Sequence, residues 1–428
     1  MRSLPQLAYE CAAQLARAAA AIAPAGDAKT IRALRARRGI RDRYRAWGAT
    51  AARDATRPLL WMHAPSVGEG LQARPVLQSI RAARPRTQLA YTFYSPSAES
   101  FARTLDVDFR DYLPFDDAGD ARQALDSLRP AALVFSKLDV WPTLAREATT
   151  RGVALGLLSA TLAASSGRRS WIAAALLRDA YAALDAIGAI SGDDAERLVA
   201  LGARAGAVTV TGDTRYDQVW ERAAASDRAS ALLAPLASGR PTLVAGSTWP
   251  ADERVLFAAW TTARRTAGDA RLIVAPHEPT ARHVDRIIEW ARGAALRVAR
   301  LGDANATADV IVVDRVGVLG DLYALADVAY VGGGFHDAGL HSVLEPAAFG
   351  APVLVGPRHD ASRDAGLLIA ARGARSESSV AGLAGVIGTW LGDTAARREA
   401  GDAARETVRA GRGATARSVS IVETLLDR

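Results

Sequence analysis

The sequence predicts an α/β protein made of two doubly wound domains that face each other across a cleft. From residue 58 onward, short apolar runs alternate with helical stretches, which is the pattern of a parallel sheet covered on both faces. A polar, alanine-rich stretch at 222–240 interrupts this alternation, and a second series of the same kind begins at Thr242. The chain has 428 residues, which is enough for two domains of ordinary size.

The apolar runs are the expected strands of two Rossmann-like sheets. In the first series they are Leu59–His63, Leu89–Phe93, Ala131–Ser136, Val153–Leu158, Ala186–Ser191 and Ala207–Thr211. In the second series they are Thr242–Ala245, Leu272–Ala275, Leu296–Ala299, Val310–Val313, Val328–Val331 and Pro352–Val355. Such sheets bind ligands at the carboxyl ends of their strands. We expect an N-terminal helical segment (1–48), a first domain (49–225), a linker (226–240) and a second domain (241–428), whose last helix is long enough to pack back on the first domain.

Composition narrows the classes of partner. The formal net charge is +7 and nearly all the positive charge is arginine, since Lys29 and Lys137 are the only lysines. This balance permits anionic ligands such as phosphates, nucleotides, acidic lipids or nucleic acid. Cys11 is the only cysteine, which excludes intrachain disulfides, argues against structural zinc and fits a reducing compartment such as the cytoplasm.

The N-terminal segment has the pattern of an amphipathic helix followed by a basic cluster. Leu4–Pro24 is apolar but contains Glu10 and Arg17, so it suits a helix on a membrane surface more than a spanning one. The cluster that follows consists of Lys29, Arg32, Arg35, Arg37, Arg38, Arg41, Arg43 and Arg45. Together they predict binding to an anionic membrane surface. The alternative is a basic helix packed against its own domain.

A glycine-rich stretch at 328–357 predicts a nucleotide site. It reads as strand, glycine turn (Gly332–Gly334), helix and strand. Glycines at the end of a strand allow a ligand to approach the backbone, and a helix N-terminus offers N–H groups to a phosphate. His341, Ser342 and Glu345 follow the same turn, and Glu345 is placed to accept from a ribose hydroxyl. An ordinary tight turn is the alternative.

Two strand-end loops of the first domain carry candidate catalytic residues. Glu69 lies in the loop after the first strand, where a carboxylate can act as a general base towards an acceptor hydroxyl. Lys137 follows the strand Ala131–Ser136, where an ammonium suits a carboxylate or phosphate, and Asp139 is placed to orient it. The alternatives are a charge favoured by the helix dipole and a solvated ion pair.

Three further strand-end loops add polar groups to the expected cleft. They contribute Arg215, then Ser247 and Thr248 as small hydroxyl donors, then His277. Each loop alone is also explained by turn chemistry. Five of the six histidines lie in strand-end loops, namely His63, His277, His336, His341 and His359. The sequence has no HExxH motif, no P-loop, no complete GxGxxG and no GxSxG, so we expect no metal site and neither an ATPase nor a Rossmann dehydrogenase.

The motifs taken together resemble the bacterial Kdo transferases, which transfer 3-deoxy-D-manno-oct-2-ulosonic acid (Kdo) from CMP-Kdo to the lipid A precursor. The matching motifs are SVGE at 66–69, WP at 141–142, GDTRYD at 212–217, AGSTWP at 245–250, APHEP at 275–279, V-G-x-L-x-x-L-Y at 316–323 and H-S-V-L-E-P at 341–346. They occur in the family's order between about residues 30 and 400, and their combination is specific although no single motif is.

The resemblance implies a GT-B fold and an inverting, metal-independent transferase without a cofactor. It makes Glu69 the catalytic base, with Lys137 and Arg215 stabilising charge on the donor carboxylate and the departing phosphate. The implied substrate- and CMP-binding residues are Ser66, Gly68, Asp139, Gly246, Ser247, Thr248, Pro276, His277, Val316, Gly317, Val318, Gly334, His341, Ser342, Val343, Leu344 and Glu345. The implied partners are CMP-Kdo, the lipid A precursor and an anionic membrane surface, but no nucleic acid. The implied location is the cytoplasmic face of the inner membrane, peripheral or N-terminally anchored.

Some positions depart from the family pattern. Lys137 stands where many members have the first acid of E-T-E-L-W-P, and Arg215 stands where many have lysine. The segment 159–163 reads SATLA in place of N-A-R-L-S, and Ser342 replaces an asparagine. Two alternatives therefore stay open. One is a GT-B enzyme acting on another nucleotide sugar, as transferase or epimerase, and the other is a non-catalytic protein that binds the membrane surface.

Overall fold

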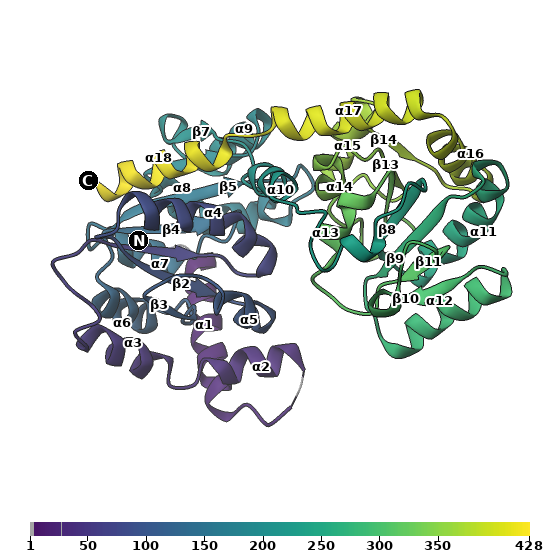
Figure 1. The fold of residues 1–428 in the computed structure, drawn as a ribbon. Helices are drawn as coiled ribbons and strands as arrows, with labels where there is room; N and C mark the ends of the chain where they lie inside the picture. The colour runs from purple at the N-terminus through teal and green to yellow at the C-terminus, as the bar shows by residue number, and fades with distance from the viewer. Residues whose placement is uncertain (1–3, 27) are drawn as a thin grey trace. The chain divides into compact units, whose positions relative to one another are not determined.

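A computed structural model describes residues 4–26 and 28–428, and these residues form two compact units (Figure 1). The first unit is the chain up to Asp217 together with Arg412–Arg428, and the second is Gln218–Gly411. Each unit is built on a seven-stranded parallel sheet with helices between the strands, which confirms the predicted α/β class. Residues 1–3 and 27 of the expected N-terminal segment lie outside the described part.

The first unit has the strand order β3-β2-β1-β4-β5-β6-β7. Its strands are β1 (Leu59–His63), β2 (Gln88–Phe93), β3 (Phe109–Tyr112), β4 (Ala132–Ser136), β5 (Ala154–Ala160), β6 (Ala186–Ala189) and β7 (Val208–Val210). Its helices are α1 (Leu4–Ile22), α2 (Lys29–Ala36), α3 (Ile40–Ala49), α4 (Val67–Ala83), α5 (Glu99–Ala102), α6 (Ala118–Leu128), α7 (Pro142–Thr149), α8 (Trp171–Ala182), α9 (Gly192–Leu201) and α18 (Ala414–Leu426), while α10 (Arg215–Ala224) begins in it. The chain order reverses between β1 and β4, so ligands are expected at their carboxyl ends.

The second unit has the strand order β10-β11-β9-β8-β12-β13-β14 and reverses between β8 and β12. Its strands are β8 (Thr242–Thr248), β9 (Arg271–Pro276), β10 (Val298–Arg300), β11 (Val310–Val312), β12 (Val328–Val331), β13 (Val353–Val355) and β14 (Ala374–Ser376). Its helices are α11 (Pro250–Ala267), α12 (Ala281–Gly293), α13 (Leu319–Leu322), α14 (Leu344–Ala348), α15 (Arg363–Ala370), α16 (Val380–Gly392) and α17 (Thr394–Ala410).

All twelve strands expected from apolar runs are present, but β3 and β14 were not anticipated. Both lie at the edge of a sheet, where one side of the strand meets solvent. Their sequences, FRDY and ARS, are accordingly polar and partly exposed. An edge strand does not need the continuous apolar run that marks a strand buried on both faces.

The boundary between the units differs from the expected linker at 226–240. The chain divides inside α10, after Asp217. The expected linker instead belongs to the second unit, because Leu233 and Leu236 are buried in its core. The end of the chain returns to the first unit, where α18 packs on α4, β5 and β6. Gly156 and Gly188 allow this close approach, since a Cβ at either position would lie against α18 side chains.

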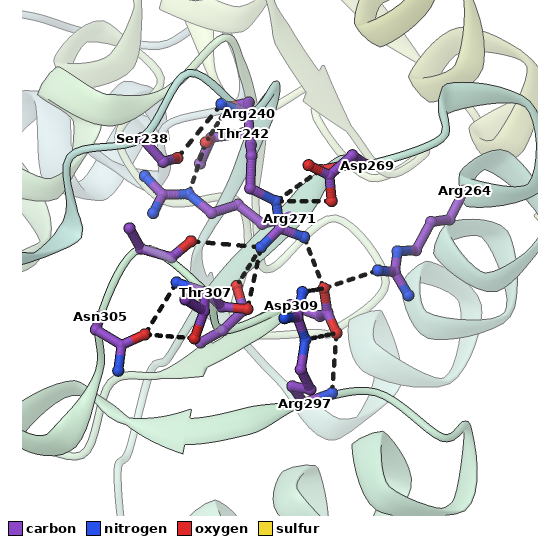
Figure 2. Close-up of polar contacts among 12 residues, drawn as sticks. Ser238, Arg240, Thr242, Arg264, Asp269, Arg271, Arg297, Asn305, Thr307 and Asp309 are labelled. Carbon is purple, nitrogen blue, oxygen red and sulfur yellow. Dashed lines mark hydrogen bonds and ion pairs between the residues drawn. The ribbon is translucent and has the colours of Figure 1, made fainter.

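An arginine network stabilises the amino end of the second sheet, which lies opposite the carboxyl ends of its strands (Figure 2). The buried carboxylate of Asp309, just before β11, accepts from Arg240 at 2.6 Å, Arg264 at 2.8 Å and Arg297 at 3.0 Å. These arginines hold the pKa of Asp309 well below its usual range, although burial of the carboxylate opposes this. Arg271, at the start of β9, is 1% exposed and donates to Thr242. Because it joins the beginnings of the four strands β8, β9, β10 and β11, this network is structural.

Most of the N-terminal basic cluster is engaged within the first unit. Five of its eight members have internal partners: Arg37 and Arg38 donate to backbone carbonyls, Arg41 pairs with Asp120, Arg43 with Asp111 and Arg45 with Asp42. Arg37 is buried and also stacks over the ring of Tyr94. Lys29, Arg32 and Arg35 are exposed. Within residues 4–26 and 28–428, no helix combines the length and the hydropathy needed to span a bilayer.

Candidate functional site

The carboxyl ends of β1 and β4 bring Glu69 and Lys137 together. Ser66 precedes α4 and Glu69 lies in its first turn, while Lys137 directly follows β4. Lys137 Nζ lies 3.0 Å from Glu69 Oε1, and the Ser66 hydroxyl donates to the other carboxylate oxygen. Lys137 adopts a left-handed backbone conformation with φ 65°, which is unusual outside glycine and is concentrated at functional sites.

Glu69 is held in its ionised form. Its partial burial opposes ionisation, but the hydrogen bond from Ser66 and the charge and hydrogen bond of Lys137 together outweigh it, so the pKa of Glu69 is lowered. Gly68 leaves open space beside this group, because a Cβ there would meet only the Ser66 hydroxyl, at 3.8 Å. The carboxylate can therefore receive a proton from a bound hydroxyl at neutral pH.

Asp139 does not orient Lys137 as expected, because it has other partners. Its carboxylate accepts from Trp141 Nε1 at 3.0 Å and lies 3.3 Å from Nε2 of the buried His63. Arg168 approaches the same carboxylate at 3.5 Å. The contacts with His63 and Trp141 and the charge of Arg168 outweigh burial and lower the pKa of Asp139. Two carboxylates, of Glu69 and Asp139, are thus fixed at neighbouring strand ends, each with its own cation.

Arg215 is anchored to α4 through a buried aspartate. Its guanidinium donates twice to Asp213 Oδ2, at 2.7 and 2.9 Å, and Gln72 donates to the other oxygen at 3.0 Å. Asp213 is 3% exposed, and the paired arginine lowers its pKa against the effect of burial. The position of Arg215 is therefore set by the helix that carries Glu69.

In the second unit, Asp252 holds the glycine turn. Its buried carboxylate accepts from Tyr330 Oη, from the backbone N–H groups of Gly333 and Phe335, and from that of Trp249, at 2.9–3.0 Å. The turn needs glycine because Gly333 has φ 98° and a Cβ there would lie 2.0 Å from a carbonyl oxygen. The carboxylate thus shapes the loop between β12 and α14.

Four rings stack beside this turn. Trp249 lies parallel to His336 at 4.1 Å between centroids and stacks on His277 at 4.5 Å. His277 in turn contacts His341 at 4.5 Å. Burial and the neighbouring His277 lower the pKa of His341, so its imidazole is held neutral. Such a stack presents flat ring surfaces and ring nitrogens to a ligand at the carboxyl edge of the sheet.

Glu345 lies at the start of α14, close to Arg222 and Asp321. Burial raises its pKa, and the charge of Arg222 only partly offsets this effect. Arg222 itself is bound to Asp321 at 3.1 Å and covers Gly320. A partly buried carboxylate of this kind gains from a hydroxyl donor, which fits the role expected for Glu345.

Several expected ligand-binding residues have structural contacts that limit their role. The Thr248 hydroxyl is buried and donates to Glu253 at 2.8 Å, so it is not the free donor that we expected. Val343 and Leu344 are 1% and 0% exposed, which leaves only their backbone for a ligand. Gly246 makes room for the hydroxyl of Tyr323, since a Cβ there would lie 2.1 Å from it.

The remaining expected residues lie at the same carboxyl edge. Pro276 ends β9, and Gly334 packs against Gly356 beyond β13. Ser247 has φ 54°, a left-handed conformation like that of Lys137 in the first unit. Val316 is 77% exposed, Gly317 has φ 88°, and Val318 precedes α13. Ser342 is exposed.

Three positioning residues were missed by the sequence reasoning. Asp213 lies in the motif GDTRYD and Trp249 in the motif AGSTWP. Asp252 follows Trp249 by three residues, which is the spacing of a helix-capping side chain. That spacing was the available signal for Asp252. Among residues 4–26 and 28–428, no three His, Cys, Asp or Glu side chains form a group that would hold a metal ion.

Two Rossmann-like units, each built on a seven-stranded parallel sheet, have the architecture of the GT-B fold. Residues 34–218 match the family model described as 3-deoxy-D-manno-octulosonic-acid transferase (kdotransferase). A relative from Bordetella pertussis, named 3-deoxy-D-manno-octulosonic acid transferase, is 32% identical over 90% of this chain and 91% of its own. A second relative of the same name, from Haemophilus influenzae, is 23% identical over 93% of this chain and 94% of its own. The chain belongs to the 3-deoxy-D-manno-octulosonic acid transferase family.

Solved structures share the fold at low identity. The UDP-GlcNAc 2-epimerase from Neisseria meningitidis, bound to UDP-GlcNAc, has a TM-score of 0.63, with 13% identity over 87% of this chain and all of its own. A glycosyltransferase from Rickettsia africae has a TM-score of 0.55, with 10% identity over 86% of this chain and 99% of its own. These likenesses concern the fold alone.

Proposed function

We propose that this enzyme transfers Kdo from CMP-Kdo to a hydroxyl of the lipid A precursor, lipid IVA, with inversion and without a metal ion, in lipopolysaccharide biosynthesis. Family membership supports the sugar and the reaction class. The observation that carries the mechanism is the ionised Glu69, open on the Gly68 side and hydrogen-bonded to Ser66 and Lys137.

In the proposed reaction Glu69 takes the proton of the acceptor hydroxyl. The acceptor oxygen then forms a bond to the anomeric carbon as the bond from that carbon to the phosphate oxygen breaks, and CMP leaves with the electron pair. Attack from the face opposite to CMP inverts the configuration. A base at the reacting hydroxyl typically contributes ~10²–10⁴-fold to the rate.

Lys137 has a double role in this scheme. In the free protein it lowers the pKa of Glu69, which makes the carboxylate a weaker base. The donor sugar carries a carboxylate that competes for the same ammonium group. When Lys137 turns to the donor, the pKa of Glu69 rises towards its ordinary value, so donor binding strengthens the base. Arg215, held by Asp213, supplies a second cation for the developing charge on the phosphate.

The second unit is proposed to bind the CMP part of the donor. The glycine turn held by Asp252 admits the phosphate, Glu345 accepts from the ribose, and the stacked rings of Trp249 and His277 lie against the nucleotide. We place the enzyme at the cytoplasmic face of the inner membrane as a peripheral protein. Exposed Lys29, Arg32 and Arg35 support contact with anionic lipid.

The test is transfer from CMP-Kdo to lipid IVA by wild type and by Glu69→Gln, with products identified by mass. We expect the variant to lose ~10²–10⁴-fold in rate and to keep its affinity for CMP. Glu99→Gln is the matched control, since this carboxylate also lies in the first unit but pairs with the exposed Arg103. Near-normal turnover in Glu69→Gln would remove Glu69 from the role. Turnover only with another nucleotide sugar would reject CMP-Kdo as donor.

A further inference from the structure

Helix α8 begins with a pair of exposed apolar side chains. Trp171 is 78% exposed and Ile172 is 52% exposed. Within the described part of the chain, Trp171 and Ile172 are the one pair of exposed large hydrophobic residues that are adjacent in sequence. They open a run of seven apolar residues, Trp171–Leu177, of which only Leu177 is buried. Packing within the first unit therefore does not account for the exposed Trp171 and Ile172, although Ala174 packs on its core.

The surrounding sequence is basic. From Ala163 to Arg178 it contains Arg168, Arg169 and Arg178 but no Asp or Glu. Arg169 is exposed beside Trp171, whereas Arg168 is partly covered. An indole ring next to an aliphatic side chain and guanidinium groups is the composition that favours the boundary between lipid headgroups and acyl chains. We call Arg168, Arg169, Trp171 and Ile172 the α8 tip.

The α8 tip lies at the same end of the first sheet as Glu69. It follows β5, which pairs with β4, the strand that ends at Lys137. Arg168 reaches Asp139 at 3.5 Å, and Tyr181 of α8 donates to the carbonyl of Leu138 at 3.2 Å. The helix that carries the tip is thus bonded to the loop that carries Lys137 and Asp139.

We propose that the α8 tip inserts into the surface of an anionic bilayer and so seats the carboxyl edge of the first sheet on the membrane. Trp171 and Ile172 enter the headgroup boundary, and Arg169 contacts lipid phosphates. Most arginines of the N-terminal cluster are already paired within the protein, so the tip adds an apolar pair and a further cation to the exposed Lys29, Arg32 and Arg35. The inference rests on the proposed function, because an acylated acceptor lies in the bilayer.

The experiment measures binding of the full chain to vesicles of phosphatidylcholine with and without phosphatidylglycerol, with no acceptor present. The double variant Trp171→Ser/Ile172→Ser should bind mixed vesicles about tenfold more weakly, which corresponds to ~1.4 kcal/mol. Arg168→Gln/Arg169→Gln should show a smaller preference for anionic vesicles and a weaker dependence of binding on salt than the wild type. Val210→Ser is the matched control, because Val210 is 49% exposed elsewhere on the first unit.

A second readout locates the indole. Trp171→Phe should keep vesicle binding but lose the part of the fluorescence that brominated lipids quench in the wild type. Equal binding of wild type and Trp171→Ser/Ile172→Ser would overturn the inference, as would equal weakening by Val210→Ser. The inference would also be overturned if the wild type self-associated without lipid and the double variant did not, because the apolar pair would then be an interface between copies of the chain. Transfer to lipid IVA in detergent is scored separately. If the wild type does not transfer Kdo to lipid IVA in detergent, the proposed function is wrong. If the wild type transfers Kdo but Trp171→Ser/Ile172→Ser still binds vesicles normally, only the proposed membrane contact of the α8 tip is wrong.

Discussion

Replacing Lys137 with methionine tests whether this lysine controls the base. Methionine keeps most of the length of the side chain and removes its charge. In the wild type the pKa of Glu69 is lowered, so its carboxylate stays ionised as pH falls below the usual range of glutamate. The stabilisation from the Glu69–Lys137 pair is present above the unfolded pKa of Glu69 and is lost as pH falls through the lower, folded value. Without Lys137, protonation should begin at a higher pH.

The size of the shift follows from the contact. A hydrogen bond to a charged group contributes ~1.5–3 kcal/mol. Lys137 is 44% exposed and Glu69 is 15% exposed, so solvent screens the pair and the lower end applies. We therefore expect the pKa of Glu69 to rise in Lys137→Met, with Ser66 still bound.

The assay is the pH dependence of kcat/KM for transfer to lipid IVA. Its acidic limb reports the base in the free enzyme and should move to higher pH in Lys137→Met, whatever the loss in absolute rate. Arg103→Gln removes an exposed cation of the same unit that pairs with Glu99, and its acidic limb should not move. An unmoved limb in Lys137→Met would refute the reasoning, because Lys137 would then not set the ionisation of Glu69.

Two further predictions concern the second unit. Glu345→Ala should weaken CMP binding about tenfold to a hundredfold, since a hydrogen bond to a charged group contributes ~1.5–3 kcal/mol. Unchanged affinity by calorimetry would displace Glu345 from the ribose. Asp309→Asn should destabilise this unit by about 3 kcal/mol in urea unfolding, because Arg240, Arg264 and Arg297 would lose their shared carboxylate. A loss below ~0.5 kcal/mol would contradict this account of the network in Figure 2.

The interior of both sheets was predictable from sequence for a physical reason. A parallel strand covered by helices on both faces must be apolar along its length, so β1 and β12 stand out as runs whose limits the structure reproduces. The edge strands β3 and β14 lack that signal because solvent reaches them. The domain boundary was misplaced because an alanine-rich segment reads as a linker, although Leu233 and Leu236 anchor it in the second unit.

By itself, the sequence determined which loops follow strands, and therefore that Glu69, Lys137 and Glu345 stand at ligand-binding edges. Only the tertiary structure decided which of these side chains meet. Glu69 and Lys137 are 68 residues apart and pair because β1 neighbours β4, an order that spacing along the chain does not encode. Asp139 is a second case. Its position two residues after Lys137 suggested that it orients Lys137, but in the structure its carboxylate contacts His63 and Trp141. Partners are set by strand order and by backbone conformations such as the left-handed turn at Lys137, and both arise only when the sheet assembles.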